Sequence, residues 1–214
     1  KQKNENDMNR SLKIFFGIII TFIVLALSSG FEMAIKSIVE SVPMGVGSQV
    51  GILVISILLI FLFSKIRIIE FNIGKVNLKQ LIHPIGLTVF LLIIRQLIST
   101  IVENDGTQVA VSMSILQKLI FIVVLASLSE ELLFRGFLQN MLSPIKSFGI
   151  KLSNTRLSLP VLISGVLFGL MHFVLLGTGA SFNYVIQIVI FGMFLGMIAG
   201  YFQEKHNNFT FAFI

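Results

Sequence analysis

The chain has 214 residues, of which 55% are hydrophobic and 12% are charged, with a net charge of +6 and no cysteine. Several apolar runs approach or exceed 18 residues, so a soluble core cannot bury them and the composition predicts a polytopic membrane protein. The lack of cysteine excludes disulfides, thiolate metal sites and cysteine nucleophiles. Lysines and arginines lie mostly at the ends of apolar runs, where they set topology in the lipid bilayer, and we expect no nucleic-acid binding.

The first half of the chain predicts three membrane-spanning helices, over about residues 12–29, 50–66 and 81–102. The stretch 31–42 has apolar residues at helical spacing but is interrupted by charges, the first of them Glu32, so we expect a separate interfacial helix or a short excursion there. Arg95 lies deep in the third span, and we expect it to reach the nearer interface or to pair with a carboxylate of the bundle.

The second half predicts spans over about residues 112–142, 158–176 and 184–202, and a seventh that begins near Phe209. The span 112–142 is too long for a perpendicular crossing and must tilt or project from the bilayer. The sequence begins with Lys1 rather than Met and stops just inside the seventh apolar run, so we expect both ends to be cut, the carboxyl-terminal one within that run. The predicted architecture is all-α: one integral membrane domain over residues 1–214, with six visible spans and a truncated seventh.

Charges in the loops alternate along the chain. The amino-terminal tail and the loops after the second, fourth and sixth spans carry lysine or arginine, whereas the loops over about 103–111 and 177–183 carry none. This alternation places the amino terminus and the basic loops in the cytoplasm. Short loops and a composition rich in Lys, Ile and Asn favour a bacterial plasma membrane.

Gly192, Gly196 and Gly200 form a small-residue stripe on the sixth span. Such a stripe lets another helix approach closely. We expect it to serve packing within the bundle; its use by a partner protein or a homo-oligomer is the alternative.

The stretch Ser127–Arg135 places charged residues inside an apolar run. Glu131 and Arg135 are four residues apart and share a helix face, so they can pair, whereas Glu130 points about 100° away from Glu131. A carboxylate at membrane depth costs about 2.5–3.5 kcal/mol on insertion scales and is a functional-site hypothesis by default. A purely structural clamp is the alternative, and it explains Glu131 and Arg135 but not Glu130.

The next span carries a second polar position at His172, which shares a helix face with Phe168. A lone histidine in an apolar helix is often only a structural residue. Here it lies, like Glu130, within a few residues of the middle of its span. Two such groups at one depth predict a site between the two helices.

A desolvated glutamate can act as a general base, so Glu130 could take a proton from a water that attacks a carbonyl carbon. His172 could bind the same water or support the developing oxyanion. We favour Glu130 over Glu131 as the base, because pairing with Arg135 stabilises the charged form of Glu131. The residues thus predict peptide hydrolysis inside a cavity of the bilayer.

A divalent metal such as zinc on Glu130 and His172 is the rival arrangement. With Glu131 included, these residues supply only two or three ligands, and the sequence has no HExxH motif. The other histidines, His83 and His206, are expected at the wrong depth and solvated.

Glu130–Arg135 fits an EExxxR motif and Phe168–His172 an FxxxH motif, and the chain resembles the CPBP intramembrane proteases over residues 112–214. That family includes CAAX prenyl endopeptidases and Abi-like bacterial proteins linked to bacteriocin maturation and self-immunity. The resemblance implies catalysis within the membrane by Glu130 and His172, with Glu131, Arg135 and Phe168 at supporting motif positions. Members are called metalloproteases by analogy, and a glutamate-dependent mechanism is also proposed for them. The family's later HxxxN-type motif would fall beyond Ile214, and His206 is not a substitute for it.

We therefore expect an intramembrane endopeptidase that cleaves a membrane-associated or hydrophobic peptide or a membrane protein. A non-catalytic scaffold or bacteriocin immunity protein of the same fold is the first alternative. A small transporter that couples Arg95 and Glu130 is the second, and it predicts inverted repeats, which the sequence does not show.

Overall fold

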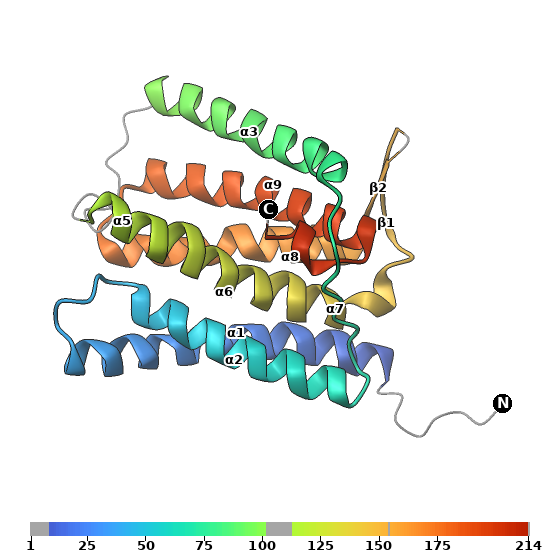
Figure 1. The fold of residues 1–214 in the computed structure, drawn as a ribbon, viewed down its shortest axis with the longest axis horizontal. Helices are drawn as coiled ribbons and strands as arrows, with labels where there is room; N and C mark the ends of the chain where they lie inside the picture. The colour runs from blue at the N-terminus through green and yellow to red at the C-terminus, as the bar shows by residue number, and fades with distance from the viewer. Residues whose placement is uncertain (1–8, 102–112, 154, 214) are drawn as a thin grey trace.

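A computed structural model describes residues 9–101, 113–153 and 155–213 of the chain. The helices lie side by side in one bundle (Figure 1). Within these residues, five helices are long and apolar enough to cross a membrane: α1 (Arg10–Ile38), α2 (Val46–Lys65), α3 (Leu78–Ile101), α8 (Leu159–Leu170) with the 3₁₀ turns Met171–Thr178 that continue it, and α9 (Phe182–His206). The predicted all-α polytopic bundle is confirmed.

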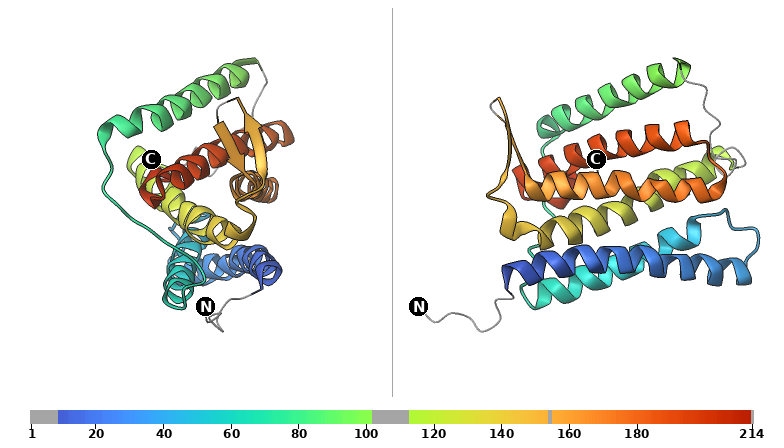
Figure 2. Two further views of the ribbon diagram at one scale, coloured as in Figure 1. Left: turned by 90° about the vertical axis from the view of Figure 1, so that its right-hand side faces the viewer. Right: turned by 180° about the vertical axis from the view of Figure 1, so that it is seen from behind.

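The fourth expected span, over about residues 112–142, is a helical column that alternates between two hydrogen-bonding patterns. Its elements in order are α5 (Ile115–Gln117), a π-helical stretch Lys118–Ala126, α6 (Ser127–Glu131), a second π-helical stretch Leu132–Leu138 and α7 (Gln139–Met141). We call these elements together the motif column. It packs against α2 on one side and α8 on the other (Figure 2). Because π-helical turns are rare and occur often at functional sites, the five-residue α6 between two of them marks the column as unusual.

The prediction of a separate interfacial helix over 31–42 is wrong, because α1 continues without a break to Ile38. The carboxylate of Glu32 accepts hydrogen bonds from the backbone N–H groups of Gly45, at 2.8 Å, and Ser48, at 3.0 Å. These donors belong to the start of α2, where backbone N–H groups lack intrahelical partners and attract negative charge. The acidic side chain is therefore satisfied by the neighbouring helix, and α1 has no reason to end there.

A short β-hairpin occupies the expected basic loop after the motif column, formed by β1 (Gly149–Leu152) and β2 (Thr155–Ser158). It lies at the same end of the bundle as the start of α1, the segment after α2 and the end of α9 (Figure 1). The described basic segments thus gather at one end, as the charge alternation requires. The expected loop over 103–111 lies outside the described residues, and the cytoplasmic placement of the basic end stays a prediction.

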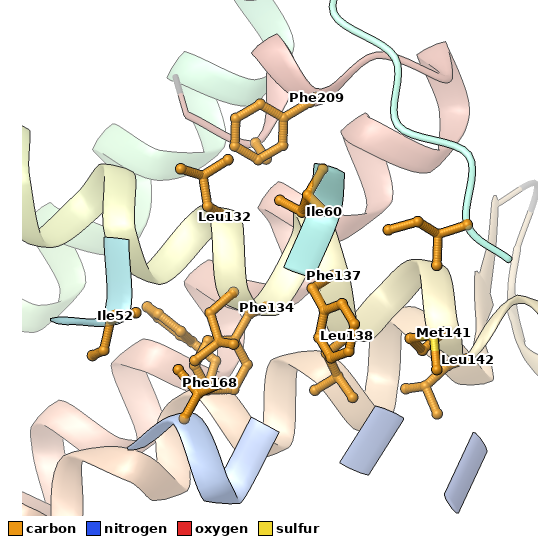
Figure 3. Close-up of a cluster of buried hydrophobic side chains, with 14 of the residues drawn as sticks. Ile52, Ile60, Leu132, Phe134, Phe137, Leu138, Met141, Leu142, Phe168 and Phe209 are labelled. Carbon is orange, nitrogen blue, oxygen red and sulfur yellow. The ribbon is translucent and has the colours of Figure 1, made fainter. Parts of the chain in front are cut away.

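The apolar core lies around the second half of the motif column. Phe134, Phe137, Leu138 and Met141 are at most 1% exposed and pack against Ile60 of α2, among others (Figure 3). Within a membrane, such contacts stabilise the bundle through close van der Waals packing. The core therefore fixes the motif column against its neighbours just beyond the charged motif.

Helix α3 is the least buried of the five long helices, and it contacts α9. The Cζ atom of Arg95 lies 5.4 Å from the centroid of the Phe191 ring of α9. Among the described residues, Arg95 has no carboxylate partner within ion-pair distance. A cation–π contact thus takes the place of the expected pairing with a carboxylate. The alternative, that Arg95 reaches the nearer interface, stays a prediction.

The chain after α9 folds back onto the segment that follows α2. Phe209–Phe211 forms a 3₁₀ turn, and the N–H of Phe209 donates to the carbonyl of Asn72 at 2.8 Å. The ring of His206 stacks on Phe211 with centroids 4.1 Å apart but stays partly exposed, in keeping with the expectation that His206 is solvated. His83 is exposed on α3, as expected.

The glycine stripe of α9 faces the inside of the bundle. A Cβ atom at Gly192 would lie 3.3 Å from the Cα of Gly169, and one at Gly196 would lie 3.0 Å from the Cα of Gly165. These glycines bring the α8 and α9 backbones together. The preferred use of the stripe in packing is confirmed, and a homo-oligomer through the same glycines stays a prediction.

Candidate active site within the membrane bundle

Glu131 and Arg135 form the expected ion pair, with 3.1 Å between Oε1 of Glu131 and an Nη atom of Arg135. The Arg135 side chain is fully buried and that of Glu131 is 9% exposed. A desolvated pair of this kind is costly to break, because the remaining charge would have no compensation. The pair therefore compensates two buried charges within the motif column itself.

Arg135 is accommodated by residues from two other helices. Gly196 of α9 leaves room for the guanidinium, since a Cβ atom there would collide with it. The Cζ atom of Arg135 lies 4.3 Å from the centroid of the Phe168 ring of α8. The ring face stabilises the cation where water is excluded. Arg135 and Phe168, both expected at supporting positions, are thus in direct contact with each other.

Three backbone carbonyls of the π-helical stretch accept side-chain hydrogen bonds. Ser164 donates to the carbonyl of Phe134 at 3.1 Å and Gln203 to that of Arg135 at 3.0 Å, while Asn140 donates to those of Arg135 at 3.1 Å and Gly136 at 2.9 Å. Buried carbonyls need such partners. The irregular backbone beside the motif is therefore satisfied by α7, α8 and α9.

Glu130 is separated from the ion pair and faces α2. Its Oε1 accepts a hydrogen bond of 2.8 Å from Nε2 of Gln49. The hydroxyl of Ser129 donates to Oε1 of the same glutamine. Sequence reasoning missed Gln49 and Ser129; the available signal was a long amide side chain at the start of an otherwise apolar run.

His172 lies in the 3₁₀ continuation of α8, close enough to Glu130 for electrostatic interaction. Its Nδ1 is 3.0 Å from the carbonyl oxygen of Phe168. Since a carbonyl only accepts, Nδ1 carries the hydrogen and Nε2 is the free nitrogen of the neutral ring. The ring also packs edge-on against Phe168, with centroids 5.3 Å apart. The two expected groups from consecutive spans are thus brought together.

A metal centre would need more donors than these. Among the described residues, no group of three acidic or histidine side chains gathers, whereas catalytic zinc takes three protein ligands. Glu131 is already paired with Arg135, which leaves Glu130 and His172. These two do not by themselves fit a zinc site, and a metal on them stays an expectation.

The comparisons with known proteins concern the part of the chain that carries these motifs. Residues 112–214 match a family model described as type II CAAX prenyl endopeptidase Rce1-like. The searches of curated proteins and of solved structures found no match. The matched range contains Glu130, Glu131, Arg135, Phe168 and His172, whereas Gln49 lies outside it.

Proposed function

Residues 112–214 belong to the Rce1-like type II CAAX prenyl endopeptidase family, and on this premise we propose that the protein is an intramembrane endopeptidase whose general base is Glu130. Its substrate is a peptide bond in a membrane-associated or hydrophobic peptide. The observation that carries the proposal is the difference between the partners of the two glutamates. Glu131 is paired with Arg135, whereas Glu130 is half-buried, accepts a hydrogen bond from Gln49 and lies within electrostatic range of His172.

In this mechanism, Glu130 accepts a proton from water, and the resulting hydroxide attacks the peptide carbonyl carbon. The tetrahedral intermediate collapses when the C–N bond breaks and the leaving nitrogen takes the proton held by Glu130. The products are a carboxylic acid and an amine. Glu130 ends unprotonated and ready for another cycle.

His172 supports this step through Nε2. In the neutral ring, Nε2 accepts a hydrogen bond and can orient the attacking water. In the imidazolium, the same nitrogen donates and can stabilise the oxyanion. The contact of Nδ1 with the Phe168 carbonyl fixes the ring and its tautomer.

The proposal is tested with the full-length protein in proteoliposomes. The probes are a farnesylated peptide that ends in a CAAX sequence, its unprenylated counterpart and a set of hydrophobic peptides. We expect the parent to cleave at least one probe, and Glu130→Gln and His172→Gln to reduce cleavage by about 100-fold or more, in keeping with the effect of a general acid–base. Glu204→Gln removes a half-buried carboxylate that contacts Ser158 away from the site, and it should retain activity.

Each contrary outcome has a distinct meaning. Full cleavage by Glu130→Gln would remove Glu130 from the mechanism. Loss of activity on chelation, restored by zinc, would assign a metal to the site. If the parent cleaves none of the probes, the non-catalytic scaffold or immunity protein becomes the better interpretation.

A further inference from the structure

Gln49 joins α2 to the motif column by contacts with two consecutive residues. Its Nε2 donates to Oε1 of Glu130 at 2.8 Å, and its Oε1 accepts from the hydroxyl of Ser129. The Ser129 hydroxyl lies also 2.9 Å from the carbonyl oxygen of Ala126, so its own orientation is restricted. Three side chains are thus linked in a row that ends at the glutamate.

The chemistry of the partners determines how the amide is oriented. A carboxylate can only accept, so the group that faces Glu130 must be the NH₂ of the glutamine, and its carbonyl oxygen must face the hydroxyl. A rotated amide would place two acceptors against each other. Glu130 therefore selects the orientation in which Gln49 donates to it, and the Ser129 hydroxyl can donate to the amide oxygen in that orientation.

The start of α2 is itself held in place. Gln49 lies in the first turn of α2, next to Ser48, whose N–H donates to Glu32 of α1. Gly51, half a turn further, packs so closely against Phe31 that a Cβ atom would lie 2.9 Å from its ring. The position of Gln49 is therefore determined by the packing of α1 on α2.

We propose that Gln49 is the positioning residue for the general base: it holds Oε1 of Glu130, so that Oε2 is presented to the attacking water. The inference rests on the proposed function. It extends the site to α2, beyond residues 112–214, so that the helices before the matched domain supply part of the active site. A carboxylate fixed in this way needs less reorientation before proton transfer.

The test uses the proteoliposome assay with the probe that the parent cleaves fastest. Gln49→Leu keeps the approximate volume and removes both hydrogen bonds. We expect kcat to fall by about 10- to 100-fold, the range that misplaced catalytic groups typically produce, with KM within about twofold of the parent value. Gln139→Leu is the control, because Gln139 is a buried glutamine whose amide donates to the Gly200 carbonyl away from Glu130.

Two further variants separate positioning from a structural role. Gln49→Glu introduces a carboxyl group that can donate to Glu130 only when protonated, so its activity relative to the parent should rise as pH falls. Ser129→Ala should lower kcat in the parent and have no additional effect in the Gln49→Leu background, because Ser129 acts through Gln49.

The outcomes distinguish this inference from the function on which it rests. If Glu130→Gln is inactive but Gln49→Leu keeps the parent kcat, the inference is overturned and the protease assignment stands. An equal loss of kcat in Gln139→Leu would reduce Gln49 to a general packing residue. If the parent cleaves no probe, the proposed function fails, and the inference fails with it because there is no base to position.

Discussion

The ring of Phe168 contacts both Arg135 and His172: Cζ of Arg135 lies 4.3 Å from the ring centroid, and the imidazole of His172 meets the ring edge-on with centroids 5.3 Å apart. The EExxxR helix and the FxxxH helix are therefore connected through an aromatic side chain. The backbone carbonyl oxygen of Phe168 also accepts a hydrogen bond from Nδ1 of His172. The residue four positions before the histidine thus contacts both the buried Arg135 cation and the imidazole of His172.

Replacing Phe168 by leucine should lower both activity and stability. Leucine keeps apolar bulk but removes the ring face, whose attraction for a desolvated cation is worth about 2 kcal/mol. We expect cleavage to fall by about tenfold or more, and the midpoint of thermal unfolding in detergent to drop. Phe194→Leu is the control, because that ring lies on α9 and is 53% exposed. Equal effects of the two substitutions would show that the contact with Arg135 has no special role.

Two ion pairs at i,i+4 spacing allow a direct comparison of burial. Glu131→Gln leaves the fully buried Arg135 without a counter-charge and should lower the free energy of unfolding by about 3–5 kcal/mol. Lys36→Ala removes the more exposed ion pair with Glu32, at 3.8 Å, and should change the free energy of unfolding by less than about 1 kcal/mol. Unfolding in detergent, followed by circular dichroism, measures both. Similar losses would mean that burial does not increase the contribution of the Glu131–Arg135 pair to stability.

Gly196→Ala should destabilise the bundle, because the added methyl group meets the Arg135 guanidinium and the Cα of Gly165 at 3.0 Å. Overpacking of this kind typically costs about 1–3 kcal/mol. Gly86→Ala is the matched helical control, since among the described residues no atom outside the adjacent backbone of α3 lies within 4 Å of its added Cβ. The control should be neutral or slightly stabilising because alanine favours helix. Unfolding midpoints that do not differ would contradict the close approach of α9.

The orientation in the membrane can be measured directly because the chain has no cysteine. Lys151→Cys places one thiol on the exposed hairpin, and Met44→Cys places one on the exposed α1–α2 turn. In intact cells, we expect a membrane-impermeant maleimide to label Met44→Cys and spare Lys151→Cys, as the positive-inside rule requires. The reverse labelling would invert the predicted topology.

The sequence was most informative where helical geometry alone decides a contact. The four-residue spacing of Glu131 and Arg135 predicts their pairing, and the 100° step predicts that Glu130 faces a different neighbour. Gln49 could not be found in this way, because its contact with Glu130 spans 81 positions and depends on how α2 packs. The predicted helix break near Glu32 was wrong for the same reason, because the partners of Glu32 are backbone groups of the next helix.

The β1–β2 hairpin was not predicted from the sequence, for a different reason. Each strand has only four residues, and Lys151 lies directly opposite Arg156, a like-charge pair that opposes strand pairing. Charge in this segment indicates topology strongly and secondary structure weakly. The prediction of a basic loop therefore described its position and not its conformation.

The buried Glu131–Arg135 pair also has consequences for biogenesis. The motif column carries Lys118, Glu130, Glu131 and Arg135, and each such charge opposes insertion of an isolated helix by the translocon. Gln49 on α2 is synthesised before this segment, whereas Gly196 and Phe168, which complete the arginine pocket, are synthesised after it. During synthesis, the column must therefore stay beside α1 and α2 until α8 and α9 arrive. Variants that disturb the α1–α2 pair should reduce the yield of inserted protein before they affect catalysis.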